Sequence, residues 1–243
     1  RIRHTRLPTR SRGLGDVYKR QLLHSATDTD ETVRSASRSA LDAIDPDWPK
    51  TAGAQCAVPS LVAVLQGRSA NASRAAAGLL HLIGPPAVPD LSSALLDGED
   101  TLKQIYVIRV LARLGPRAAG AMDGLGRALG SEFLHVRIAA AQAMAKIAPP
   151  PESAIPRLVA GLSERSADAR ESMALCLACA GPAAEPAVPH LLLLLVDRNE
   201  QVRQAAEAAL TQIGPKAVPA LIALLETRDA QRLGAMMDTE RRV

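Results

Sequence analysis

Residues 190–225 read HLLLLLVDRNEQVRQAAEAALTQIGPKAVPALIALL, and this stretch decides the fold. Within it, residues 202–213 place small and apolar side chains at i, i+3, i+4 and i+7, the spacing of a helix with one apolar face. Gly214 tolerates the positive φ that often ends a helix, and Pro215 prevents the helix from continuing. Pro219 then stands where a proline opens a helix without losing a hydrogen bond. The stretch therefore predicts a helix, a short turn and a second helix.

The same unit recurs along the chain with a period of about 33 residues, within the range of known helical repeats. Gly-Pro pairs begin at positions 84, 115, 181 and 214, and Ala-Pro stands in the equivalent place at 148. An arginine in the middle of the unit recurs at Arg137, Arg170 and Arg203, with Arg34 in an earlier copy. One helical hairpin cannot bury its own apolar face, whereas stacked neighbours can. We therefore predict an all-α fold, an α-solenoid in which about six hairpins form a right-handed superhelix.

The predicted repeat domain covers residues 22–243. Several copies depart from the pattern: Lys103-Gln104 replaces Val-Arg in the third, Ala148-Pro149 replaces Gly-Pro in the fourth, and an insertion, 45–50, lengthens the connection after the first. Excision of one full period, such as 183–215, is expected to leave a folded shorter solenoid. The units are expected at 22–53, 54–85, 86–116, 117–149, 150–182, 183–215 and, as a partial copy, 216–243.

The first 21 residues, RIRHTRLPTRSRGLGDVYKRQ, differ from the repeats in composition. They hold seven Lys and Arg residues and one Asp, and no apolar period runs through them. Residues 11–21, SRGLGDVYKRQ, resemble the translation of a transposase-type sequencing-library adaptor over their whole length. We therefore interpret residues 1–21 as an adaptor-derived or disordered segment outside the fold, and we expect the true N-terminus to be missing.

This interpretation changes the meaning of the net charge. The chain has 29 Lys+Arg against 25 Asp+Glu, a net of +4 that would suggest a nucleic-acid partner. Residues 22–243 keep 22 basic and 24 acidic residues, a net of −2, with three aromatic residues. Because nucleic-acid binding needs a basic face and favours aromatic side chains, a DNA-binding repeat protein is the weakest hypothesis, and we expect no such partner.

Cysteine content and the lengths of the apolar runs argue against two further classes of protein, disulfide scaffolds and membrane-spanning proteins. Three cysteines are too few for a disulfide scaffold. The apolar runs are too short or interrupted to span a membrane, so we expect no membrane segment. The compartment is left open, with the cytoplasm as the default expectation.

The units resemble HEAT repeats, in the short bacterial form often called lyase-type HEAT-like repeats. The ankyrin and tetratricopeptide families have a closer period of about 33–34 residues, but their Thr-Pro-Leu-His and Trp/Gly/Tyr signatures are absent from this sequence. The residues that carry the resemblance are Val202-Arg203, Ala205-Ala206, Ala209-Leu210, Ile213-Gly214-Pro215 and Ala217-Val218-Pro219, echoed at Val136-Arg137 and Val33-Arg34.

The sequence holds no recognisable catalytic motif. Cys176 and Cys179 form a CxxC inside a predicted helix, and no second pair completes a metal site, so we interpret them as small buried residues. Iron-dependent HEAT enzymes similar to deoxyhypusine hydroxylase use His-Glu pairs, and no histidine of this sequence is followed by Glu. Phosphate-binding loops and nucleophile elbows are also missing from the sequence. We therefore expect no catalytic residue, cofactor or metal.

Two kinds of residue are candidates for binding. The column Arg34, Arg137, Arg170 and Arg203 could pair with acids in a ladder that links copies, since Asp28 and Asp197 each stand six residues before an arginine of the column. Alternatively, the column could present cations to an acidic peptide, a phosphate or a propionate. Trp48, the only tryptophan, lies in a proline-flanked acidic loop and could either pack over its own repeat or anchor a partner.

The favoured function is a non-enzymatic scaffold. The inner helices of the predicted stack would line a concave surface that binds a partner protein or peptide, and the chain is expected to be a monomer. The alternative is a bilin-chromophore lyase or its chaperone-like subunit, because similar short repeats occur in phycobilisome lyases. No residue is diagnostic of bilin handling, so that alternative rests on the resemblance alone.

Overall fold

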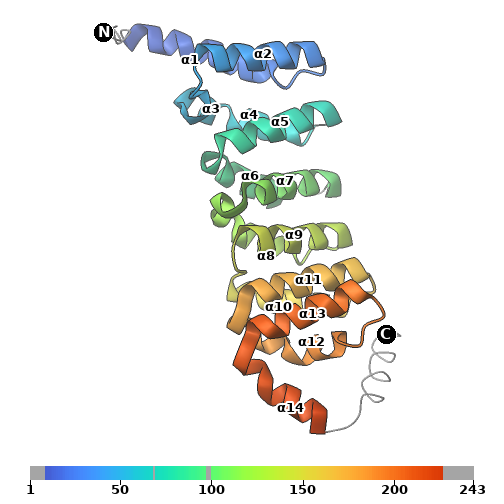
Figure 1. The fold of residues 1–243 in the computed structure, drawn as a ribbon. Helices are drawn as coiled ribbons and strands as arrows, with labels where there is room; N and C mark the ends of the chain where they lie inside the picture. The colour runs from blue at the N-terminus through green and yellow to red at the C-terminus, as the bar shows by residue number, and fades with distance from the viewer. Residues whose placement is uncertain (1–8, 68, 97–99, 227–243) are drawn as a thin grey trace. The chain divides into compact units, whose positions relative to one another are not determined.

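The computed structural model describes residues 9–67, 69–96 and 100–226 (Figure 1). Within these ranges the chain forms α-helices, 3-10 helices and turns, and no β-strand, as an α-solenoid requires. The chain divides into two compact units, residues 1–94 and 95–243. In each unit a helix is followed by a tight turn and an antiparallel partner, so the predicted helical hairpin is the repeating element.

The first unit contains the first hairpins and the insertion. Its helices of 14 residues, α2 and α5, are the second helices of the first two predicted repeats. The insertion is not an extended loop, because its second half forms the 3-10 turn η1, which directly precedes the short helix α3. The elements are α1 Thr9–Ser25, α2 Glu31–Ile44, η1 Trp48–Lys50, α3 Ala52–Cys56, α4 Val58–Leu65, α5 Ala70–Ile83, η2 Pro85–Ala87 and α6 Val88–Leu96, the last of which ends just beyond the unit boundary.

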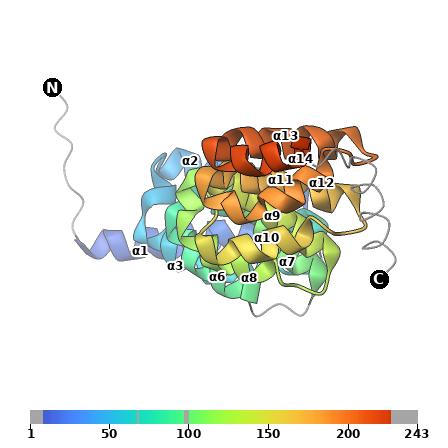
Figure 2. The same cartoon turned by 90° about the horizontal axis from the view of Figure 1, so that it is seen from below.

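The second unit alternates short and long helices in strict order. The long helices α7, α9, α11 and α13 have 14 residues each and follow one another along the unit (Figure 1). Viewed from the α14 end, the successive hairpins of this unit project over one another (Figure 2). The elements are α7 Thr101–Leu114, η3 Gly115–Ala121, α8 Met122–Ala128, α9 Leu134–Ile147, η4 Glu152–Ala154, α10 Ile155–Gly161, α11 Ala167–Ala180, η5 Gly181–Ala187, α12 Val188–Leu194, α13 Glu200–Ile213, η6 Gly214–Ala217 and α14 Val218–Glu226.

Helix α13 shows how the sequence sets both ends of a helix. At its start, the Asn199 side chain accepts hydrogen bonds from the backbone N–H groups of Gln201 and Val202. Its end is set by Gly214, which has a positive φ of 69°. The apolar side chains that the 3.6-residue period selects are all buried: Val202, Ala205, Ala206, Ala209, Leu210 and Ile213.

The four Gly-Pro glycines share a backbone conformation that other residues avoid. Their φ angles lie between 55° and 80°, and Gly214 combines its φ of 69° with a ψ of −136°. At the equivalent Ala148 the fold changes instead, since this residue is extended with φ −166° and ψ 168°. Three prolines follow Ala148 and stop helix α9 without a glycine.

Replacing Gly214 with alanine is expected to lower the free energy of unfolding by about 1–3 kcal/mol, because the conformation is strained for any residue with a Cβ. The added Cβ would meet open space, so the cost is conformational and not steric. Gly78→Ala, inside α5 and also facing open space, is the matched control and should stabilise by up to about 1 kcal/mol. Urea denaturation followed by circular dichroism measures both, and equal effects of the two substitutions would refute this account.

Helix α1 crosses the predicted boundary at residue 21. It starts at Thr9, and its Lys19 donates a hydrogen bond of 2.7 Å to Asp45 beyond α2. This bond is the main reason that the pKa of Asp45 is lowered from its usual value. Residues of any origin can extend a helix toward its N-terminus if they tolerate the helical conformation. The presence of α1 therefore does not show whether residues 9–21 derive from an adaptor. The adaptor interpretation stays a prediction, and part of it, residues 1–8, lies outside the described residues.

The helical run Ala167–Leu194 is long and apolar enough, by length and composition, to cross a membrane. In the structure this run consists of α11, η5 and α12, and Gly181 interrupts it with a φ of 55°. Met173, Leu177 and Leu191 in this run are buried in the hairpin cores. The apolar character of the run is therefore accounted for by two successive repeats, and the expected absence of a membrane segment stays a prediction.

Candidate functional site

The recurring arginines close the turn inside each hairpin. In each case one terminal nitrogen, Nη1, donates to two backbone carbonyls, those of the sixth and fifth residues before the arginine. These carbonyls lie past the end of the first helix and have no helical partner of their own. The four pairs of distances are 2.8 and 2.7 Å for Arg34, 2.8 and 3.0 Å for Arg137, 2.7 and 3.0 Å for Arg170, and 2.8 and 3.2 Å for Arg203.

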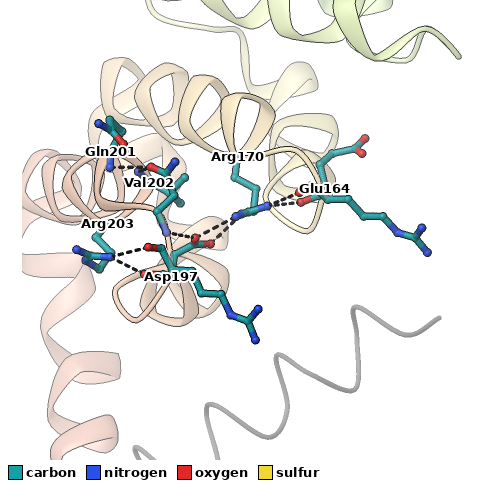
Figure 3. Close-up of polar contacts among 9 residues, drawn as sticks. Glu164, Arg170, Asp197, Gln201, Val202 and Arg203 are labelled. Atoms are coloured by element: carbon teal, nitrogen blue, oxygen red, sulfur yellow. Dashed lines mark hydrogen bonds and ion pairs between the residues drawn. The ribbon is translucent and has the colours of Figure 1, made fainter.

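Two of these arginines also link one repeat to the next. Arg170 donates from Nε and Nη2 to the two carboxylate oxygens of Asp197, at 2.8 and 3.0 Å, and both side chains are almost inaccessible, at 8% and 0% exposed (Figure 3). Arg137 pairs through Nη2 with Glu164, one repeat further on. The ladder that links copies is therefore present between these repeats, and it runs forward along the chain.

Asp28 and Asp197 were the acids expected to pair with Arg34 and Arg203, and for both arginines this expectation is wrong. Arg34 donates to the backbone carbonyl of Asp28 and not to its carboxylate. Asp197 offers Arg203 its backbone carbonyl at 2.8 Å, while its carboxylate accepts from Arg170 and from the backbone N–H of Asn199 (Figure 3). The buried charge of Arg170 is thus committed within the fold, which argues against its predicted contact with a partner. For Arg34, Arg137 and Arg203, partner binding stays a prediction.

Where the arginine is missing, a shorter side chain contacts the first helix. Ser73 stands at the arginine position of the second repeat, and its hydroxyl donates to the carbonyl of Val64 at 3.3 Å. Gln104 stands at the same position of the third repeat and donates to the carbonyl of Leu95 at 3.5 Å. The position therefore serves turn closure in these copies too, although no cation occupies it.

Trp48 is not an exposed anchor. Its side chain is 1% exposed in the first unit, and its indole N–H donates to Asp42 at 2.8 Å. The prediction that it binds a partner is therefore wrong, because the 3-10 turn η1 places the ring inside its own repeat, where its only polar atom is satisfied.

The CxxC pair is divided between the core and the surface. Cys176 is buried, and this burial, with a smaller effect of Cys179, raises the pKa of its thiol to about 12. Cys179 is exposed and free, so only half of the predicted pair is a buried residue. Within the described ranges, no three His, Cys, Asp or Glu side chains converge as metal ligands.

We expect a thiol reagent at mildly alkaline pH to modify Cys56 and Cys179 in the folded protein and to leave Cys176 unmodified. The first two thiols are exposed, whereas Cys176 is inaccessible and its raised pKa keeps it protonated. Mass spectrometry of the alkylated protein before and after unfolding tests this. Modification of Cys176 at the rate of Cys179 in the native state would contradict the packing described for α11.

The long helices of the second unit form a continuous face whose outward side chains recur with the period of the sequence repeat. Leu102, His135 and Asp168 occupy equivalent places on α7, α9 and α11. None of these places belongs to the buried stripe, and Leu102 is 66% exposed although it is apolar. Because the apolar stripe dominates the period of the sequence, this second, exposed column was missed there. The sequence does contain a signal for this column, because the spacing of the repeat also holds for these positions outside the core.

A groove runs along this face and has two adjoining hollows. The larger, about 640 Å³, lies between α7 and α9. The smaller, about 490 Å³, lies between α9 and α11. Apolar side chains and cations line the larger hollow, among them Leu102, Ile105, Ile138, Arg109, Arg113 and Lys146.

The two hollows differ in charge. Arg109, Arg113 and Lys146 contribute positive charge to the larger one, whereas Asp168 and Glu171 of α11 contribute negative charge to the smaller, which Lys146 of α9 also lines at the junction of the two. In the part of the chain that the structure describes, none of these five side chains makes a hydrogen bond or an ion pair. The groove thus combines exposed apolar side chains with charges that remain available to a ligand.

The fold and the turn-closing arginines together define the class of the protein as an α-solenoid of repeated helical hairpins. Residues 88–178, which run from the start of α6 to near the end of α11, match the family model of HEAT repeats. This segment confirms the resemblance on which the prediction rested. No curated protein matches the chain.

Solved structures of repeat proteins are similar to the chain over most of its length. An engineered protein matches with a TM-score of 0.54 and 21% identity over 81% of this chain and 98% of that one. A designed armadillo repeat protein in complex with the peptide (KR)4 matches with a TM-score of 0.51 and 18% identity over 80% and 99%. The complex of CpcE and CpcF of phycocyanin lyase from Nostoc sp. PCC7120 matches with a TM-score of 0.53 and 25% identity over 63% and 98%. These likenesses confirm the solenoid fold.

Proposed function

We propose that the protein is a non-enzymatic scaffold that binds a segment of a partner protein in the groove along α7, α9 and α11. The observation that carries the proposal is the groove itself, which combines exposed apolar side chains with charges that have no partner within the described chain. Exposed apolar patches with polar surroundings are typical of interaction sites. Support also comes from similar designed armadillo repeat proteins, one of them solved in complex with the peptide (KR)4 and others designed for modular peptide recognition.

The test must leave the arginine ladder intact. Charge reversal at Arg170 would break the core, so loss of a partner in that variant would be uninformative. We would instead replace Leu102 and Leu175, which are 66% and 42% exposed in the two hollows, with serine. The matched control is Ile222→Ser on α14, a similarly exposed apolar residue outside the groove.

Affinity capture is expected to recover a partner with the wild type and the Ile222→Ser control, and to lose it with the Leu102→Ser/Leu175→Ser variant. Circular dichroism of all three proteins checks that the fold is unchanged. Equal recovery by the groove variant would remove the groove from the proposal.

A second candidate function is a subunit of a bilin lyase. The observation that favours it is the likeness to the CpcE–CpcF complex at 25% identity. In that case the cations Arg109, Arg113 and Lys146 would be suited to the propionate groups of a tetrapyrrole. Mixing the purified protein with bilin is the test, and the absence of any visible absorption shift would count against the candidate.

A further inference from the structure

The charges along the groove have an order, and this order restricts the chemistry of a ligand. Cations line the hollow between α7 and α9, and acids follow on α11. Leu102 and Ile105 supply apolar surface in the same hollow, and Ile138 and Lys146 of α9 line both hollows. A ligand that follows the groove from α7 to α11 therefore meets positive charge with apolar surface first and negative charge second.

The spacing of the helices converts this order into a sequence pattern. Packed helices lie roughly 8–10 Å apart, so the path from α7 to α11 spans roughly 16–20 Å. An extended peptide covers about 3.3 Å per residue, and this path therefore corresponds to about five or six residues. Side chains of a peptide that are separated by this length can reach the two oppositely charged ends of the groove at once.

We propose that the groove binds a peptide segment with acidic residues at one end, leucine-like residues in the middle and a basic residue at the other end, about five or six residues apart. The acidic residues pair with Arg109, Arg113 and Lys146, and the basic residue pairs with Asp168 and Glu171. The proposal rests on the proposed function and adds the chemistry of the partner. Complementary charges select the partner and its direction, because the reversed peptide brings like charges together.

The experiment uses the whole chain and three fluorescein-labelled synthetic peptides of equal length. The first has the acidic–apolar–basic order, the second has the same residues scrambled, and the third has the leucines replaced by serine. Fluorescence anisotropy at low and high salt gives the affinities. We expect the first peptide to bind at least tenfold more tightly than either of the others, and to weaken as salt rises.

Two protein variants test the assignment of the charges. Arg109→Glu/Arg113→Glu should weaken the first peptide at least tenfold and should bind a peptide whose acidic end is replaced by lysines. The matched control, Arg127→Glu, changes an exposed arginine of α8 outside the groove and should have no effect. A double variant that still binds the first peptide normally would overturn the proposal.

The outcomes separate this proposal from the one on which it rests. Equal binding of all three peptides, or binding that ignores salt and the charge reversal, overturns the charge order and leaves the groove as a binding site. Binding of single-stranded DNA or inorganic phosphate as tight as that of the first peptide overturns the peptide as the ligand. Failure of all three peptides to bind also overturns the charge order. The proposed function itself fails only if the Leu102→Ser/Leu175→Ser variant captures its partner normally.

Discussion

Arg170→Leu is expected to lower the free energy of unfolding by about 3–5 kcal/mol, the usual cost of removing one partner of a buried ion pair. The substitution leaves the carboxylate of Asp197 inaccessible to water and without the guanidinium that meets both of its oxygens. It also leaves the carbonyls of Glu164 and Arg165 without the donor that closes their turn. Urea denaturation followed by circular dichroism measures the change.

Arg165→Leu is the matched control for this substitution. Arg165 lies in the same turn and is exposed, so the same change removes a charge and leaves the buried pair in place. Its effect should stay within about 0.5 kcal/mol. A double variant, Arg170→Leu/Asp197→Leu, should recover part of the loss, because apolar residues in both places leave no buried charge. If Arg170→Leu and Arg165→Leu prove equally stable, the ladder has no energetic role.

The sequence predicted those features of the fold that depend on neighbours along the chain. The 3.6-residue period located α13 and its buried stripe, and Gly214 and Pro219 marked where one helix ends and the next begins. Each of these signals acts over a few residues, through backbone conformation or through the face of one helix. The longer period of the repeat then implied stacking, because a single hairpin leaves its apolar face uncovered.

The partners of the arginines could not be predicted in the same way. The column itself was identified, but Arg170 reaches Asp197 across 27 residues, and this contact depends on how far one hairpin is shifted against the next. The acid six residues before Arg203 is nearer in the chain, yet it offers its backbone carbonyl. Trp48 shows the same limit, since η1 and its bond to Asp42 decide whether a loop tryptophan faces inward.

The groove was predicted as a surface but not as a set of residues. Inner helices of a solenoid were expected to line it, and the two hollows lie between the second helices of successive hairpins, α7, α9 and α11. The side chains that line the groove belong to the exposed column at Leu102, His135 and Asp168 and its neighbours. This column is hard to recognise in the sequence because the buried apolar stripe dominates the periodic pattern. The arginine column attracted the functional interpretation because it recurs, although its recurrence serves turn closure in each copy.

Removing one full period is expected to keep the fold, and the position of the cut decides the stability. Deletion of 150–182 joins Pro149 to Ala183 in register, and it brings Asp197 to the place of Glu164, so that Arg137 regains an acid. Deletion of 183–215 also joins the chain in register but removes Asp197, the acid that pairs with the buried Arg170. We expect the second protein to be less stable than the first by about 3 kcal/mol, the cost of an unpaired buried charge.

A half-period deletion, 183–199, should abolish the fold. It removes α12 and leaves α11 followed directly by α13, so the apolar stripes of both helices lose the layer that covers them. Gel filtration should show aggregates, whereas both full-period proteins elute as folded species with the same helical signal per residue. Because the half-period cut removes fewer residues than the full-period ones, its failure cannot be attributed to lost length. A soluble, cooperatively unfolding 183–199 deletion would mean that the hairpin is not the unit of stability in this chain.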